Sequence, residues 1–188
     1  HNEMFDNEFH GQGGPLNVSK IMHENQPTKD FVKAGSKIHE FNEDFNGGEQ
    51  EGVGFYQTTQ KDGKRCSTAK AYLVPALERS NLTVITEANV NKILIDNDKA
   101  SGVEYIEEDG NIKSVAVSKE VLLCSGAFGS PQILLRSGVG PKEEIEKHGI
   151  KHKVDLPGVG KNLQDHIDYL TVHKLSLIHI SEPTRPAI

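Results

Sequence analysis

The chain has 188 residues, about the size of one domain. Its 21 lysines and arginines against 27 aspartates and glutamates give a net charge of −6, which argues against a nucleic acid or an anionic membrane as its partner. The longest apolar runs fall far short of the ~20 residues that a membrane-spanning helix needs.

Two helices are predicted before residue 80. Residues 30–41 place apolar side chains at helical spacing, which predicts a short amphipathic helix, and residues 42–52 form a polar, glycine-containing loop after it. Residues 67–79 predict a second helix, which Pro75 must kink or shift and which Ser67 or Thr68 can cap. The apolar face of the first helix consists of Phe31, Ala34, Ile38 and Phe41.

The middle of the chain is rich in β-formers. Turn-forming residues at 96–98 and 109–111 separate the runs, and the second of these turns is typical of a hairpin. The pattern predicts a β-meander. The four predicted strands are 82–86, 90–95, 102–106 and 112–117.

A predicted strand, turn and helix follow. Residues 121–124 are a short apolar run typical of a strand buried on both faces of a sheet, and 125–127 have small side chains. Ser130 and Pro131 are typical of a helix start, and Gly138 is typical of a helix end. These residues fit either a cofactor-binding turn or an ordinary strand-to-helix crossover.

Six blocks in one order carry a family resemblance. They include Ser125-Gly-Ala-Phe-Gly-Ser-Pro-Gln-Ile-Leu-Leu-Arg-Ser-Gly-Val-Gly140 and Pro157-Gly-Val-Gly-Lys-Asn-Leu-Gln-Asp-His166. Together they resemble the glucose-methanol-choline (GMC) family of FAD-dependent oxidoreductases, and among its members the choline dehydrogenase-like alcohol dehydrogenases, over roughly residues 9–174. The other blocks are 9–18, 63–73, 81–86 and 101–105.

The resemblance implies a mixed α/β (α+β) fold. It comprises part of a Rossmann-like FAD-binding domain with an inserted β-meander, and part of a substrate-binding domain. We assign residues 1–62 to the substrate-binding domain, 63–165 to the FAD-binding domain and 166–174 to the return to the substrate domain. Residues 175–185 back-translate, codon by codon, to a transposase adapter used in DNA sequencing libraries, so 175–188 are expected to be adapter read-through.

Four residues are predicted to bind FAD. The resemblance gives Val90 main-chain contacts to the adenine end of the cofactor, although a β-branched strand residue facing a core explains it equally well. Gly126 lacks a side chain and so permits close approach of the cofactor. Asp165 and His166 are expected to orient the flavin or a neighbouring loop by hydrogen bonds, with the fixing of a buried crossover as the alternative.

No catalytic or metal-binding residue is assigned. The glycine-rich G-x-G-x-x-G turn that seats the diphosphate of a dinucleotide does not occur in the sequence. The resemblance places the catalytic histidine much nearer the C-terminus of the full-length family proteins, so His166 is not taken as the base. Cys66 and Cys124 have no paired spacing, and His10 is a candidate for ordering its loop.

For the intact parent, the resemblance implies oxidation of a small-molecule alcohol to a carbonyl, with hydride transfer to flavin. The fragment itself is expected to be inactive. An FAD-containing hydroxynitrile lyase and a non-catalytic interaction module are the alternatives. The particular alcohol and the electron acceptor, oxygen or a quinone-like carrier, stay open.

Overall fold

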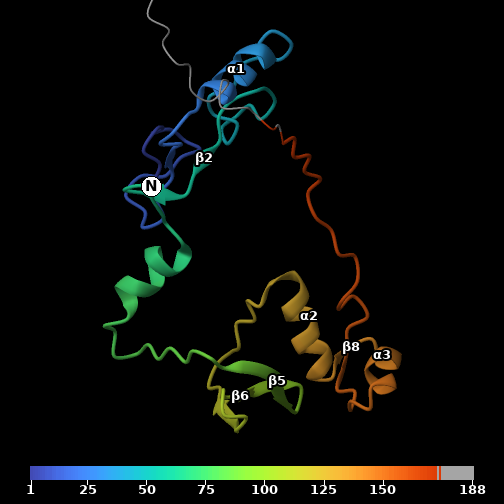
Figure 1. Cartoon of the computed structure of the whole chain (residues 1–188). Helices are drawn as coiled ribbons and strands as arrows, with labels where there is room; N and C mark the ends of the chain where they lie inside the picture. The colour runs from blue at the N-terminus through green and yellow to red at the C-terminus, as the bar shows by residue number, and fades with distance from the viewer. Residues whose placement is uncertain (173, 175–188) are drawn as a thin grey trace, which may run out of the picture. The chain divides into compact units, whose positions relative to one another are not determined.

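The computed structural model describes residues 1–172 and 174, and the chain forms two compact units. The first is built from His1–Thr83 together with Val172 and Lys174, and the second from Val84–Thr171. Figure 1 shows the first unit in blue to green and the second from green to orange. The predicted adapter-derived residues 175–188 lie outside the described residues, and the predicted domain boundaries stay predictions.

Short antiparallel pairs hold the first unit together. β1 (Ser19–Lys20) pairs with β2 (Gln57–Thr58), and β3 (Gln60–Lys61) pairs with β4 (Lys64–Arg65). Asp62 and Gly63 both have positive φ, 51° and 70°, as a two-residue hairpin turn requires. These strands are too short to form a continuous sheet, so loops make up most of the unit.

The first helix begins earlier than predicted. α1 spans Gln26–Gly35, and the Asn25 side chain caps it by accepting a hydrogen bond from the Thr28 amide at 2.9 Å. The predicted helix over 30–41 was therefore wrong in position, because this cap and Pro27 set the start and the helix ends at Gly35. Its predicted apolar face is also wrong, since Ile38 is 81% exposed beyond the helix end.

The second predicted helix is confirmed as two short pieces. η1, a π-helix, spans Ala69–Leu73, and η2, a 3₁₀-helix, spans Val74–Ala76. The Ser67 hydroxyl accepts a hydrogen bond from the Lys70 amide at 3.2 Å, so Ser67 caps the start as predicted. The change of helix type coincides with Pro75, which cannot donate a backbone hydrogen bond.

A three-stranded antiparallel sheet forms half of the second unit. β5 (Asn89–Asp96), β6 (Lys99–Ile106) and β7 (Ile112–Ala116) lie in the order β5-β6-β7, which confirms the last three predicted strands. The first predicted strand, 82–86, is wrong. That segment has no regular structure and no strand partner within the part of the chain that the structure describes.

Two helices and a parallel strand pair form the rest of the unit. α2 (Gly126–Arg136) packs against β5 (Figure 1), and α3 (Lys142–Lys147) lies between β8 (Val139–Gly140) and β9 (Val154–Asp155) in sequence. No helix of the described residues is long and apolar enough to cross a bilayer. The buried apolar side chains of the unit are Ile93, Ile133, Val139 and Ile145.

The predicted strand before α2 is wrong. Residues 121–124 have no regular structure and Leu122 is 77% exposed, because no strand among the described residues pairs with them. α2 also begins at Gly126, four residues before the predicted start, so Pro131 lies inside the helix. The predicted helix end is confirmed, since Gly138 follows α2 with a φ of 86°.

Candidate functional site

The main chain of Val90 faces the open edge of the sheet. The Ile93 amide donates outward, away from β6, to the Ser137 hydroxyl at 2.8 Å, so Ile93 and its partner Val103 are a non-hydrogen-bonded pair. The direction of the main-chain N–H and C=O groups alternates from residue to residue along β6, so Tyr105 faces the same way as Val103. Tyr105 is the residue that opposes Val90. Val90 therefore also turns its N–H and C=O away from β6.

This edge offers a donor and an acceptor side by side. Val90 is half-buried, and within the described residues no hydrogen bond satisfies its main-chain groups on the open side of β5. An unpaired strand edge is a template for any ligand that presents a complementary acceptor and donor. The edge of a purine base has such a pair, so the local geometry fits the adenine end of a dinucleotide.

A β-bulge lies next to Val90. Val90 opposes Tyr105 and Lys92 opposes Glu104, so Asn91 is an extra residue in β5 with no partner in β6. The Asn91 amide donates to Glu104 Oε1 at 2.5 Å and accepts from the Arg136 guanidinium of α2. The bulge is thus tied both to the sheet and to the helix.

The Glu104 carboxylate is held in its charged form. The hydrogen bond from Asn91 is the main cause that lowers the pKa of Glu104 below its ordinary value of 4.5. Lys92 adds to the effect with its Nζ 3.4 Å from Oε1, and desolvation opposes it. A lowered folded-state pKa stabilises the fold above about pH 4.5, and this stabilisation is lost as the pH falls through the folded-state value.

Glu104→Gln is therefore expected to flatten the acid limb of the stability profile. The thermal midpoint of the full-length protein, measured from neutral pH to below about 4.5, should fall less steeply in this variant than in the unchanged protein. Glu107→Gln is the control, because its carboxylate only forms an exposed pair with Lys113 at 3.9 Å. Equal slopes in the unchanged protein and Glu104→Gln would contradict the assignment.

The C-terminal end of α2 covers part of the same edge. Ser137 is 3% exposed, and its hydroxyl donates to the Ile133 carbonyl at 2.6 Å while accepting from the Ile93 amide. Farther along, Lys153 Nζ donates to the Ile95 carbonyl at 3.0 Å. The edge of β5 is thus closed from Ile93 onward and open at Val90.

Gly126 lies at the other end of α2. Its φ is 77°, which disfavours any residue with a side chain, and no atom lies within 4 Å of where a Cβ would stand. Eleven helical residues rise by roughly 15 Å from Gly126 to Arg136, so the helix does not bring Gly126 to Val90. The two residues lie in one unit and belong to separate parts of any shared ligand site.

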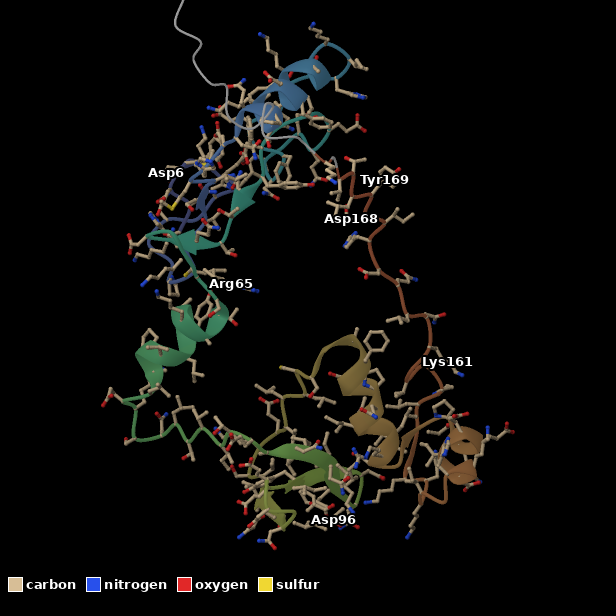
Figure 2. All side chains as sticks on the ribbon, viewed as in Figure 1. Asp6, Arg65, Asp96, Lys161, Asp168 and Tyr169 are labelled. Atoms are coloured by element: carbon tan, nitrogen blue, oxygen red, sulfur yellow. The ribbon has the colours of Figure 1, made fainter. Side chains whose placement is uncertain are left out.

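Asp165 and His166 lie in an exposed segment without regular structure. Asp165 Oδ1 accepts a hydrogen bond from the His166 amide at 2.8 Å, and neither side chain bonds to β5 or α2 within the described residues. Figure 2 shows Asp168 and Tyr169 in the same extended segment, and Tyr169 is 87% exposed. The structure therefore does not bring these two predicted residues together with Val90 or Gly126.

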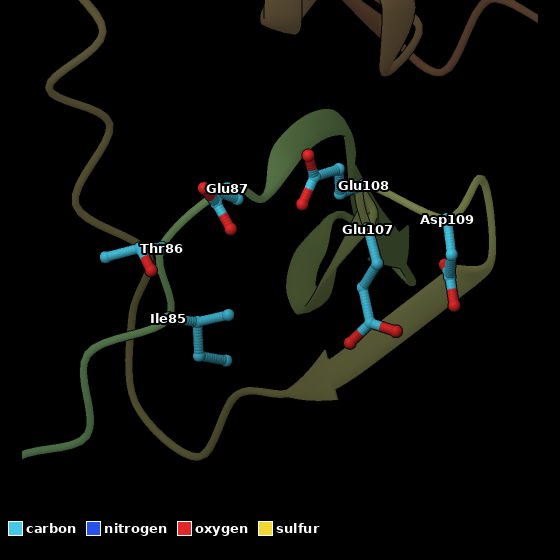
Figure 3. Close-up of a pocket in the computed structure, with 6 residues that line it drawn as sticks. All are labelled: Ile85, Thr86, Glu87, Glu107, Glu108 and Asp109. Carbon is cyan, nitrogen blue, oxygen red and sulfur yellow. The ribbon is translucent and has the colours of Figure 1, made fainter.

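An open hollow of about 530 Å³ lies beside the turn between β6 and β7. Figure 3 shows its walls, which come from residues 85–87 on one side and 107–109 on the other. Four of its six side chains are carboxylates, which repel the diphosphate of a dinucleotide. None of the predicted site residues lines this hollow. Its lining residues are Ile85, Thr86, Glu87, Glu107, Glu108 and Asp109.

A buried polar network orders the loops of the first unit. His10 Nε2 lies 2.7 Å from Asp44 Oδ1, and the Gln57 amide donates to the same oxygen at 3.1 Å. Asn2 in turn donates to Gln57 Oε1 at 3.0 Å. The prediction that His10 orders its loop is therefore confirmed.

The structure shows two unpaired cysteines. Cys66 is buried in the first unit, whereas Cys124 is exposed just before α2. Across residues 1–172 and 174, no three histidine, cysteine or acidic side chains form a group that could hold a metal ion.

Comparison with known proteins supplies a family match. Residues 2–168 match the family model described as GMC oxidoreductase. An alcohol dehydrogenase (acceptor) of Pseudomonas putida is 48% identical over 171 residues, which are 89% of this chain and 31% of that protein. An oxygen-dependent choline dehydrogenase of Citrobacter koseri is 45% identical over 166 residues, 86% of this chain and 30% of that protein. The chain thus spans about a third of these relatives.

Solved structures agree with the sequence match. Pyridoxine 4-oxidase from Mesorbium loti superposes with a TM-score of 0.77 at 34% identity, over 84% of this chain and 31% of the other. An FAD-dependent oxidoreductase from Chaetomium thermophilum superposes with a TM-score of 0.80 at 30% identity, over 86% and 28%. The predicted family resemblance and the mixed helix-and-strand fold of a partial FAD-binding domain are confirmed.

Proposed function

Because the chain belongs to the GMC oxidoreductase family, we propose that the full-length protein that carries it is an FAD-dependent oxidoreductase that converts an alcohol to a carbonyl compound. The observation that carries this proposal is the family match over residues 2–168, which covers most of the chain. When bound, FAD supplies the acceptor for the hydride that leaves the alcohol carbon. The residues of this chain bind and orient that cofactor.

Val90 contacts the adenine end of FAD through its main chain. The free N–H and C=O on the open edge of β5 support this assignment, because they present the donor and acceptor that a purine edge requires. Gly126 forms a second part of the site. Its positive φ and the open space around it leave room for the cofactor to lie against the backbone.

Asp165 and His166 hold the flavin or a neighbouring loop by hydrogen bonds. Both are exposed, and one carboxylate oxygen and the whole imidazole ring are open to a partner outside the described contacts. We assign neither as the base that takes the hydroxyl proton. The resemblance places that histidine much nearer the C-terminus of the full-length family proteins.

The substrate is a small-molecule alcohol. The names of the two relatives, alcohol dehydrogenase and choline dehydrogenase, support an alcohol and do not select one. Oxygen and a quinone-type carrier are both candidate acceptors. Purification of the full-length protein and an absorbance spectrum test the proposal first. A bound flavin is expected, and a colourless protein that takes up no added FAD would refute it.

Val90→Pro is expected to weaken FAD binding by about tenfold, the effect of one lost hydrogen bond. Proline removes the outward N–H and leaves the β5–β6 ladder intact, because that N–H does not take part in the ladder. Val90→Ala is the matched control, since it changes the side chain and keeps the backbone groups. FAD titration of the apoprotein measures both, and equal weakening by both variants would show that the side chain makes the contact.

A further inference from the structure

We propose that Asn91, Arg136 and Glu104 form a lock that holds the bulge of β5 and thereby keeps the Val90 main chain at the open edge of the sheet. The three are positioning residues, because they act on the cofactor through Val90. This inference rests on the proposed FAD site. It adds a set of side-chain contacts that favours the bulged register of β5 against β6 over the regular one.

The two registers differ in the direction of Val90. With the bulge, Val90 opposes Tyr105 and faces outward. In a ladder without it, Asn91 would take the place opposite Tyr105 and Val90 would oppose Ile106, the next residue of β6. Because orientation alternates along a strand, Val90 would then turn its N–H and C=O inward to pair with β6. The regular register would remove the cofactor contact and add ladder hydrogen bonds.

The contacts of Asn91 favour the bulged register. Both polar groups of its side-chain amide are hydrogen-bonded: the NH₂ group donates to Glu104 in β6, and the oxygen accepts from Arg136 in α2. In the regular register Asn91 would stand opposite Tyr105 and its side chain would leave Glu104. The side-chain hydrogen bonds of the lock therefore compensate for the β5–β6 backbone hydrogen bonds that are lost at the bulge. The helix fixes the register because Arg136 is the last residue of α2, one turn after the buried Ile133.

Three variants of the full-length protein test the lock. Arg136→Met removes the guanidinium and keeps the aliphatic stem, and Asn91→Ala removes both hydrogen bonds. Deletion of Asn91 is the decisive variant, because it makes Lys92 adjacent to Val90 and so leaves Val90 opposite Tyr105, facing outward, in a regular ladder. The control is Lys142→Met, which removes one cation from the exposed face of α3.

FAD affinity of each apoprotein and its thermal midpoint are measured together. Arg136→Met and Asn91→Ala are expected to bind FAD about tenfold more weakly, and the deletion and the control to bind it within about threefold of the unchanged protein. Adding Arg136→Met to the deletion is expected to cause no further loss. A role of Arg136 that does not pass through Asn91, on the cofactor or on the whole fold, would instead predict a further loss in the deletion background, where the contact with Asn91 is already absent.

Two results would overturn the lock. One is unchanged FAD affinity in Arg136→Met and in Asn91→Ala. The other is a tenfold loss when Arg136→Met is added to the deletion, which would mean that Arg136 acts on the cofactor or on the whole fold. If Asn91→Ala does not fold, the test rests on the FAD affinity of Arg136→Met in the unchanged protein and in the Asn91 deletion. Failure of the proposed function is distinct, because the unchanged protein would then bind no FAD.

Discussion

Residues 1–174, expressed alone, are expected to oxidise no alcohol, with a rate at least about a thousandfold below that of the full-length protein. General-base catalysis alone is worth 10²–10⁴-fold, roughly, and the sequence lacks the segment in which the resemblance places the base. It also lacks the G-x-G-x-x-G turn through which a Rossmann-like domain binds the diphosphate of a dinucleotide. The missing base and the missing diphosphate-binding turn both lower the rate of alcohol oxidation.

Alcohol-dependent dye reduction measures this difference. The full-length protein and the 1–174 piece are compared at equal concentration with added FAD and a series of primary alcohols. No FAD binding and no dye reduction by the piece is the expected result. Dye reduction by the piece alone would mean that it contains both a complete cofactor site and a base.

Gly138→Ala is expected to destabilise the full-length protein by about 3 kcal/mol or more. A φ of 86° strains any residue with a side chain by about 1–2 kcal/mol. The added Cβ would also collide with the Lys151 carbonyl, a backbone atom that cannot rotate away. The Gly138 carbonyl accepts from the Lys153 amide at 2.8 Å, so relief of the collision would disrupt the entry to the β8–β9 pair.

Gly149→Ala separates the two causes. Gly149 has a φ of 69° and no atom within 4 Å of a Cβ position, so alanine there brings the strain without the collision. Its expected cost is about 1 kcal/mol. Thermal unfolding and the yield of soluble protein report both variants. Equal losses at the two positions would contradict the collision at Gly138.

Local signals predicted much of the second unit. Alternating β-formers and the turn residues at 96–98 and 109–111 were sufficient for β5, β6 and β7, because a hairpin needs only neighbouring residues. The glycine that ends α2 was likewise readable, since its positive φ is a local requirement. Elements that depend on near neighbours are thus the ones that the sequence predicts.

Elements that depend on distant partners were not predictable. The apolar run 121–124 has the composition of a buried strand, but a strand exists only where another strand pairs with it, and the described residues provide none. The position of α1 was a different error. Asn25 and Pro27 are local start signals, and the spacing of four apolar residues outweighed them although Gly35 ends the helix.

The candidate site depends on a feature that composition hides. Val90, Asn91 and Lys92 read as an uninterrupted strand, whereas the structure inserts Asn91 as a bulge. Only the register shows that Val90 faces outward, and only the tertiary contact shows that Arg136 reaches Asn91. An asparagine by itself does not signal the bulge, because Asn89 in the same strand has a regular partner in β6.

We expect the full-length protein to oxidise an alcohol by reducing its bound flavin. Mixing the purified protein with a primary alcohol in the absence of oxygen, and following the flavin spectrum, tests it most directly. The expected result is loss of the oxidised-flavin absorbance together with one carbonyl product per flavin. An unchanged flavin spectrum across a series of alcohols, with cleavage of a cyanohydrin by the same protein, would contradict it and identify a lyase instead.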